Sequence, residues 1–465
     1  MSVNPAFDEL MQLRQGKPPG ERIELRGTDP VLPTPFALGE TNSAILLAVG
    51  VAVNDLWELK TGDRQNLSIG VREAAAALKS YEYFTDPEPD GAEAWALQRS
   101  RQQISTPHPT KDGRYFLPHM GLPHLAERIL KILDCDYELD SVKRAVACWD
   151  AMELEDEVAR ANGCGAMVRS TEEWQASEQG QALSDKPVVE IIKIAESEPM
   201  PLPAGDRPLS GINVLDLTRI LAGPTCARTL AEHGANVLMV TAQHLPQAER
   251  FVKDTSHGKR SCFLDLRQAE QREQILSLVS SADVFSQGYR PGVMQRLGLS
   301  PEELARHRPG LIYTSMNCYG FEGPFSDRAG WEQLAQTVTG IADEQGIESP
   351  QLLPAAACDY TTGYLAAYGT LLALGLRARF GGSYHVRASL CQSAMFLQRQ
   401  RRTTQPELQR TNLEISAQSL VDKIRSTQSD YGEISFLGPV LEMSATPPNW
   451  TRSSPKLGRD PATWQ

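Results

Sequence analysis

The sequence predicts an α/β protein in which a doubly wound parallel, Rossmann-like large domain is joined to a smaller α+β domain. From residue 208 onward, short apolar runs alternate with helical patterns, which is typical of strand–helix–strand units. A proline-rich linker, 196–207, separates this part from a first half that consists mainly of helical patterns. The length of 465 residues and the 41% hydrophobic content allow more than one buried core.

In the second half, apolar runs mark five strands of the expected sheet, with a helix over Gln268–Ser281. These strands are expected at Ile212–Leu217, Asn236–Val240, Cys262–Leu266, Asp283–Ser286 and Leu311–Ser315. A parallel sheet binds ligands at the carboxyl ends of its strands, so the loops that follow them are candidate binding loops.

The first half begins with a loose arm, 1–35, rich in Pro, Gly and charge. Apolar periodicity and turn residues then predict an alternation of helices with a few strands. The helices are expected at Thr41–Leu59, Arg72–Tyr83, Leu122–Leu133 and Ser141–Asn162, and the strands at Gln65–Val71 and Gly113–Leu117. The predicted domains are therefore the arm, a first half at 36–195, the linker, a large domain at 208–400 and a return segment at 401–465.

Composition narrows the classes of partner. The net charge of −12 provides no basic field for nucleic acid or an anionic membrane. The eight cysteines are scattered without metal-ligand spacing, which argues against a zinc site or a disulfide framework and fits a reducing compartment. Met1–Gly20 lacks the apolar core of a signal peptide, and the apolar run Ala44–Val53 is about half the ~20 residues of a membrane helix. A cytoplasmic protein without a metal is expected.

The segment Pro354–Gly369, PAAACDYTTGYLAAYG, holds the candidate nucleophile. Thr361 and Thr362 are good N-cap residues, so Asp359 is expected just before a helix, where free N–H groups and the macrodipole favour a carboxylate. Small neighbours leave room for a substrate, which makes Asp359 a candidate nucleophile. The same pattern also fits a carboxylate that only caps the helix.

Cations recur in the expected binding loops although the chain is acidic. A set of this kind at successive loops of one sheet indicates a ligand that carries phosphates, with ordinary surface charge as the alternative. The candidates are Arg219 after the first strand, Lys259 and Arg260 in a turn before the third, and Tyr289, Arg290 and Arg296 after the fourth.

Several segments in one order resemble the class III CoA-transferases, the family of formyl-CoA transferase, the carnitine and bile-acid CoA-transferases and α-methylacyl-CoA racemase. They are LSGINVLDLTRILAGPTCARTLAEHGANV (209–237), HGKRSCFLDL (257–266), GYRPGVMQRLGLSPEEL (288–304), GWEQLAQTVTG (330–340) and AAACDYTTG (355–363). The resemblance covers roughly 209–395 and implies the two-domain fold described above.

The resemblance implies that Asp359 attacks an acyl-CoA thioester, forms a mixed anhydride and then an aspartyl-CoA thioester, and passes CoA to a small carboxylic acid. It places the acidic partner on Glu332 and CoA contacts on Lys259, Tyr289, Arg290 and Arg296. No cofactor is then bound permanently, because coenzyme A is part of the substrate.

Two departures from the family pattern keep alternatives open. After the second strand the usual Lys or Arg is missing from the run Met239–Ala242, which favours a non-catalytic acyl-CoA-binding relative. The racemase branch has a histidine where this chain has Trp331, which argues against an acyl-CoA racemase or isomerase.

The first half resembles another part of the same family, in segments 41–75 and 112–136. The halves align at an offset of 319, which places Gly50 on Gly369, Gly62 on Gly381 and Glu40 on Asp359. Since each half lacks what the other supplies, one competent site at Asp359 is expected. The assembly is either an intramolecular pseudo-dimer of the halves or a homodimer.

Overall fold

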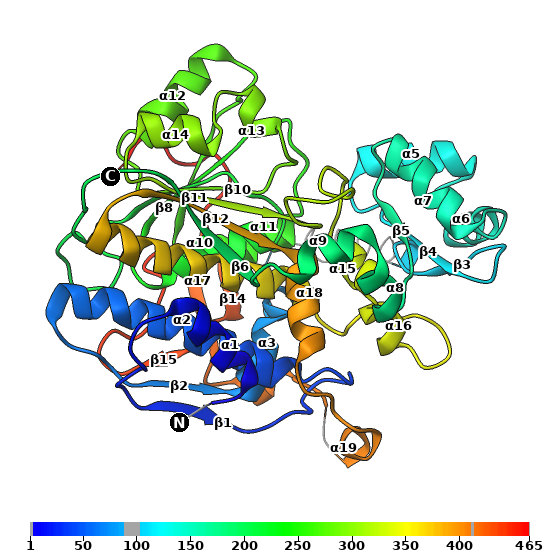
Figure 1. Ribbon diagram of the computed structural model, residues 1–465, viewed down its shortest axis with the longest axis horizontal. Coiled ribbons are helices and arrows are strands. Elements are labelled where there is room, and N and C mark those ends of the chain that lie inside the picture. Colours follow the sequence, from blue (N-terminus) through cyan, green and yellow to red (C-terminus); the bar gives the residue numbers. More distant parts are fainter. Residues whose placement is uncertain (1–2, 88–102, 411–412, 465) are drawn as a thin grey trace.

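The computed structural model describes residues 3–87, 103–410 and 413–464, and a seven-stranded sheet lies at its centre (Figure 1). The strand order is β6 (Val189–Ala195), β12 (Ser383–Ser389), β11 (Ile312–Asn317), β10 (Val284–Gln287), β7 (Asn213–Asp216), β8 (Asn236–Thr241) and β9 (Lys259–Phe263). All neighbours are parallel except the edge strand β6, which runs antiparallel to β12. The α/β class is therefore confirmed.

Helices cover both faces of this sheet because alternate strand residues point to opposite sides. Val214 and Val237 join the core beneath α10 (Ala222–Glu232) and α17 (Ala357–Phe380). Their neighbours Leu215 and Leu238 join the core beneath α12 (Ala269–Val279) and α14 (Pro301–His307).

Strand β9 begins three residues earlier than expected, and this changes the position of two candidate residues. The apolar run starts at Cys262, but the parallel pairing of β8 with β9 begins at Val237 and Lys259. Lys259 and Arg260 therefore lie inside the strand and are buried, instead of in a turn before it.

The smaller domain lies at one end of the molecule (Figure 1) and has its own core, which includes Phe116, Ile129 and Leu154. It combines an antiparallel sheet, β3 (His108–Pro109), β4 (Tyr115–Pro118) and β5 (Gly165–Met167), with α5 (Pro123–Leu133), α6 (Leu139–Val146) and α7 (Ala151–Arg160). The prediction of a single helix over 141–162 is wrong. The chain turns between the C-cap Ala147 and the N-cap Asp150, so two helices form.

The first residues do not form a loose arm. Helix α1 (Pro5–Arg14) buries Phe7 and Leu10, and the Asn4 side chain caps it by accepting the Phe7 N–H at 2.9 Å. Strand β1 (Ile23–Arg26) then pairs with β2 (Leu67–Gly70), which also pairs with β15 (Glu442–Met443) of the return segment. The two ends of the chain thus build one sheet.

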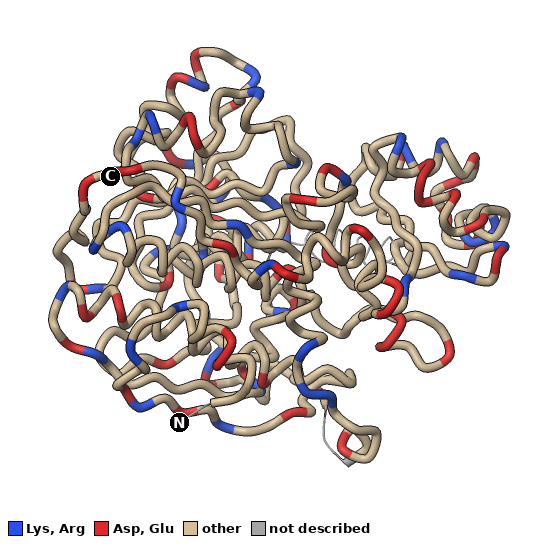
Figure 2. Tube along the Cα trace, in the orientation of Figure 1, with Lys and Arg blue, Asp and Glu red and all other residues tan. Residues whose placement is uncertain are grey.

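The helix α2 (Leu38–Thr61) packs beside α17, and the pair joins the two halves. By length and composition α2 is the one helix among the described residues that is long and apolar enough to cross a membrane, but 78% of its apolar window is buried inside the molecule. Acidic and basic positions are interspersed along the described trace (Figure 2).

The remaining elements connect these layers. They are α3 (Val71–Ala77), η1 (Ser80–Tyr83), α8 (Thr171–Ala176), α9 (Glu178–Ser184), α11 (Glu249–Thr255), α13 (Val293–Arg296), α15 (Glu332–Thr339), α16 (Ile341–Gln345), α18 (Leu390–Arg399), α19 (Gln405–Arg410), η2 (Ala417–Leu420), β13 (Ile424–Ser429) and β14 (Gly432–Leu437).

Candidate active site

The first turn of α17 positions Asp359. The helix begins at Ala357, four residues before Thr361, so Asp359 lies within it and the expectation of a carboxylate in front of the helix is wrong. The helix has no side-chain cap of its own at Ala356. A cap from a distant residue replaces it: the Glu332 carboxylate accepts the backbone N–H groups of Cys358, at 3.0 Å, and of Asp359.

Glu332 is itself held by the next turn of α15. The Gln336 side-chain amide donates to Glu332 Oε1 at 2.5 Å, and its own oxygen accepts the Leu353 N–H at 2.8 Å. Glu332 is 4% exposed, so its carboxylate is occupied by protein donors. It fixes the backbone beneath the candidate nucleophile.

The two carboxyl groups share a buried environment, which changes their acidity. Burial, and then the charge of Glu332, raise the pKa of Asp359 well above its ordinary value. Burial also raises the pKa of Glu332, although the two backbone N–H donors oppose this. Asp359 therefore keeps its proton to higher pH than an exposed aspartate, and its ionised form is poorly hydrated.

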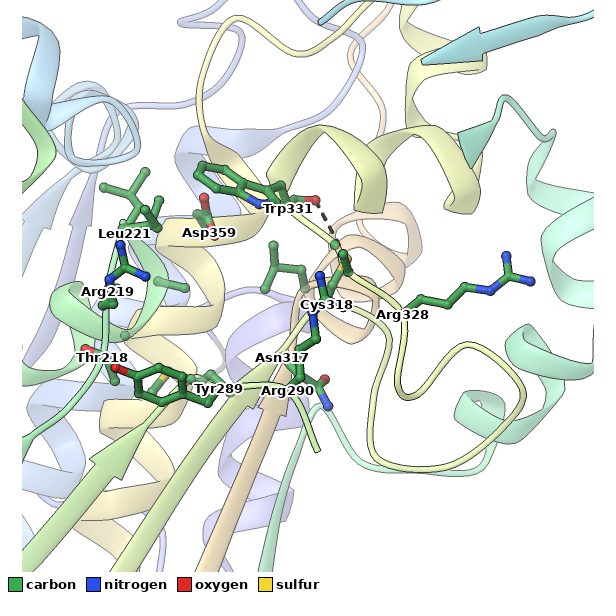
Figure 3. Close-up of a pocket in the computed structure, with 18 of the residues that line it drawn as sticks. Thr218, Arg219, Leu221, Tyr289, Arg290, Asn317, Cys318, Arg328, Trp331 and Asp359 are labelled. Carbon is green, nitrogen blue, oxygen red and sulfur yellow. Dashed lines mark hydrogen bonds between the residues drawn. The ribbon is translucent and has the colours of Figure 1, made fainter. Parts of the chain in front are cut away.

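Asp359 opens into a cavity of about 260 Å³ between the large and small domains (Figure 3). The walls come from the loops after β7, β10 and β11, the segment before α15, the starts of α17 and α18, and the start of α5 in the small domain. The lining residues are Leu122, His124, Leu125, Leu217–Gly223, Gly288–Pro291, Met316–Cys318, Ser326, Arg328–Trp331, Asp359 and Leu390.

Three of the predicted ligand-binding residues line this cavity. They are Arg219, Tyr289 and Arg290, from the loops after β7 and β10. Arg219 donates to the Pro246 carbonyl, and burial lowers the pKa of its guanidinium. Arg290 Nη1 lies 3.3 Å from Asn162 Oδ1 of the first half, which places a cation at the junction of the halves.

The structure does not bring the other three cations to the cavity lining. Lys259 Nζ is buried and donates to Asp216 Oδ2 and the Pro224 carbonyl, both at 2.9 Å. Arg260 donates to the Thr463 carbonyl at 2.8 Å, and Arg296 ends α13. Their role in CoA binding stays a prediction.

The loop after β7 contains a conformation that the sequence did not indicate. Ile220, between Arg219 and Leu221 in the cavity wall, has φ 71°, which a β-branched residue rarely adopts. Such strain concentrates at functional sites.

Sequence reasoning also missed wall residues. In the sequence Trp331 is distinguished by the histidine that it replaces, and its position directly before Glu332 is the one signal that it lies near the site. Cys318, Leu122 and His124 carry no motif, and they reach the cavity only because distant segments meet there.

The start of α2 resembles the start of α17, 319 residues further along the chain. Both α2 and α17 have 24 residues, and Glu40 is the third residue of α2 as Asp359 is of α17. The Glu40 N–H donates to Asp29 Oδ2 at 2.7 Å, as the Asp359 N–H donates to Glu332. The Glu40 carboxylate differs in being paired with Arg401, at 3.1 Å.

Among residues 3–87, 103–410 and 413–464, no group of three or more His, Cys, Asp and Glu side chains is arranged to hold a metal ion.

Comparison with known proteins identifies the family. Residues 209–419 match the model of CoA-transferase family III. The chain is 32% identical to the acetyl-coenzyme A transferase nodX of Hypoxylon pulicicidum over 412 residues, which cover 78% of this chain and 69% of that protein. It is 30% identical to an acyl-CoA transferase of Gibberella moniliformis over 411 residues, which cover 79% and 72%.

Among solved structures, a CAIB/BAIF family protein from Brucella suis matches with a TM-score of 0.39 and 29% identity, covering 49% of this chain and 65% of that one. The matches to the family model and to the two fungal transferases confirm the resemblance read from the segments between 209 and 395. The chain belongs to CoA-transferase family III and is a CoA-transferase.

Proposed function

We propose that this CoA-transferase moves CoA from an acyl-CoA thioester to a small carboxylic acid through covalent intermediates on Asp359. The observation that carries the proposal is the placement of Asp359: its carboxylate opens into a cavity with cationic walls, while Glu332 holds its backbone from behind. Family membership supports CoA transfer in general, and the covalent route is our inference.

In the first step, an Asp359 carboxylate oxygen attacks the thioester carbonyl, the C–S bond breaks, and CoA leaves as a thiolate. The thiolate then attacks the Asp359 carbonyl and expels the donor's acyl group as a free carboxylate, which leaves an aspartyl-CoA thioester. An acceptor carboxylate reverses the sequence and departs as the new acyl-CoA. Burial of Asp359 favours the first step because a poorly hydrated carboxylate is a stronger nucleophile.

For CoA itself, we assign Arg219, Tyr289 and Arg290, which line the cavity where the loops after β7 and β10 meet. Guanidinium groups suit phosphates because they donate two parallel hydrogen bonds. No permanently bound cofactor is required, since CoA enters and leaves as part of the substrates.

We further propose that the large domain is doubly wound and that 36–195 and 208–400 derive from a partial duplication. The two halves of one chain then form a pseudo-dimer with a single active site. Three matches at the offset of 319 support the duplication: α2 with α17, β2 with β12, and α3 with α18. The pairing of Glu40 with Arg401 supports a single site, because it leaves that carboxylate neutralised. A cytoplasmic location stays a prediction.

Neither alternative function is favoured by the site. A racemase needs a base at the position before Glu332, where Trp331 offers only an indole N–H. Binding alone does not require a carboxylate in the cavity lining whose pKa is raised by burial, whereas catalysis on that carboxylate does.

The test is a screen of acyl-CoA donors against carboxylic acid acceptors, read as new acyl-CoA by mass spectrometry. Asp359→Asn is expected to lower turnover by several orders of magnitude, because an amide is not a competent nucleophile. The control is Asp63→Asn in an exposed turn. Turnover in Asp359→Asn close to that of the unchanged protein would reject the covalent route.

A further inference from the structure

The segment before α15 fixes Trp331 rigidly in the cavity wall. A side chain at Gly330 would come within 2.3 Å of Cys318 Cβ, so this residue must be glycine for the two segments to pack. The Cys318 thiol donates to the Trp331 carbonyl at 3.7 Å. Glu332, the next residue, is anchored on the first turn of α17.

The Trp331 ring is fixed as well, by a residue of the first half. It stacks on the His119 imidazole with ring centroids 4.5 Å apart and an interplanar angle of 29°. His119 is 3% exposed, and its backbone N–H donates to the Cys164 carbonyl at 2.7 Å within the small domain. Burial lowers the pKa of His119 to about 4, so the stacked ring is neutral at pH 7.

Trp331 and Asp359 face the same cavity. In Figure 3 the indole and the carboxylate both point into it, with Leu221 and Cys318 in the neighbouring wall. If Asp359 attacks a thioester carbonyl, the acyl chain starts beside these side chains.

We propose that Trp331 sets the upper size of the acyl group and restricts the enzyme to short-chain acyl-CoA donors, with His119 as the positioning residue that holds the indole in place. This inference rests on the proposed role of Asp359. Trp331 then has a function of its own, besides replacing the histidine of the racemases. Because His119 belongs to the small domain, that domain also contributes to the choice of donor.

The test measures adduct formation on the protein, so it needs no knowledge of the acceptor. The protein is incubated with acetyl-, butanoyl-, hexanoyl- or octanoyl-CoA and hydroxylamine, which converts the acylated or CoA-linked aspartate to a hydroxamate. The rate of hydroxamate formation is followed by intact-protein mass spectrometry. The unchanged protein is expected to react fastest with the short donors.

Trp331→Ala is expected to raise the octanoyl-to-acetyl rate ratio by about tenfold or more, since even one methylene in a tight pocket changes specificity by roughly 10–200-fold. Trp331→Phe keeps an aromatic plate and should keep the ratio near its original value. His119→Ala, which leaves the cavity lining in place, should raise the ratio partly, and His119→Phe should restore it.

Two results would overturn the proposal: an octanoyl rate equal to the acetyl rate in the unchanged protein, or an unaltered ratio in Trp331→Ala. If Trp331→Ala does not fold, an unaltered ratio in His119→Ala also counts against it. Absence of any hydroxamate with every donor would instead reject the Asp359 mechanism, so the two failures can be told apart.

Discussion

The carboxyl groups of Asp359 and Glu332 lie close together but have different surroundings. The Glu332 carboxylate accepts hydrogen bonds from two backbone N–H groups and the Gln336 amide, whereas the Asp359 carboxylate faces the cavity. One carboxyl group thus positions the backbone and the other is free to react. Their closeness links the two acidities, and this gives a prediction for pH.

The rate of adduct formation is expected to rise with pH until Asp359 is ionised. Because its pKa is raised, the nucleophilic carboxylate is lost at a higher pH than for an ordinary aspartate as pH falls. Glu332→Gln removes a neighbouring charge that raises this pKa, so the acidic limb of the pH–rate profile should move to lower pH. The maximum rate should also fall, because the hydrogen bonds that hold the Asp359 backbone are weakened.

The measurement is the rate of hydroxamate formation between about pH 4 and 8, with Glu348→Gln at an exposed position as the control. A limb that stays in place, or moves to higher pH, in Glu332→Gln would contradict this coupling.

A second residue-scale prediction concerns the cations of the cavity. Arg219→Ala and Arg290→Ala should each weaken CoA binding by about 1–3 kcal/mol, the scale of a charge-assisted hydrogen bond, and lower its salt dependence. Isothermal titration calorimetry with CoA at two salt concentrations measures both effects. Arg306→Ala, on the exposed side of α14, serves as the control. Unchanged affinity in both cavity variants would remove these arginines from the CoA site.

Among single residues, the sequence predicted best those that belong to a recognisable motif. It indicated Asp359, Glu332, Arg219, Tyr289 and Arg290, all of which lie at the cavity or support it. It could not show that Glu332 caps a helix 25 residues further along the chain, because that contact depends on tertiary packing. For the same reason it could not foresee that Lys259 pairs with Asp216 inside the sheet.

At the scale of elements, α17 is the helix on which the two halves meet. A side chain at Gly369 would lie 2.7 Å from Val386 Cγ1 of β12 and 2.8 Å from Val189 Cγ2 of β6. A side chain at Gly375, six residues later on the same helix, would be 3.5 Å from Leu56 Cδ2, which is ordinary contact.

Gly369→Ala is therefore expected to reduce the free energy of unfolding by about 1–3 kcal/mol, because β-branched valines in paired strands cannot move aside. Gly375→Ala should be neutral or stabilise by up to about 1 kcal/mol, because alanine favours the helix. Chemical unfolding of both variants makes the comparison. Equal destabilisation by the two substitutions would contradict the packing described for Gly369.

Apolar runs predicted the central strands of the sheet, because strands that are buried on both faces have a continuous hydrophobic pattern. Strands β6 and β12 of this sheet, and β1 of the sheet that joins the two ends of the chain, were missed. Strand β6 has no fully apolar run, and its partner β12 lies almost 190 residues away in sequence. Strand β1 has four residues, none of them fully buried, within a segment rich in proline and glycine.

At the scale of the whole molecule, each half completes the other. Strand β6 of the first half extends the large sheet, and β15 of the second half pairs with β2 of the first. The Ser80 hydroxyl donates to Asp254 Oδ2 at 2.6 Å across the same boundary, where Arg228 also pairs with Asp254. His124 and Leu122 bring the small domain to the Asp359 cavity.

Neither 1–203 nor 204–465 is therefore expected to form active protein alone, whereas co-expression of the two should restore transfer. The readouts are soluble yield and hydroxamate formation. As a control, the intact chain with a protease site in the linker, cut after folding, should stay active because packing holds the halves together. Stable folding and full activity of 204–465 alone would contradict the complementation.

Locating the covalent intermediate shows whether the protein uses one nucleophile in one site built from both halves. The protein is treated with acyl-CoA and hydroxylamine, digested, and mapped by mass spectrometry. We expect a hydroxamate on Asp359, none on Glu40, and no label in the corresponding peptide of Asp359→Asn. A hydroxamate on Glu40, or CoA transfer that leaves Asp359 unlabelled, would contradict this expectation.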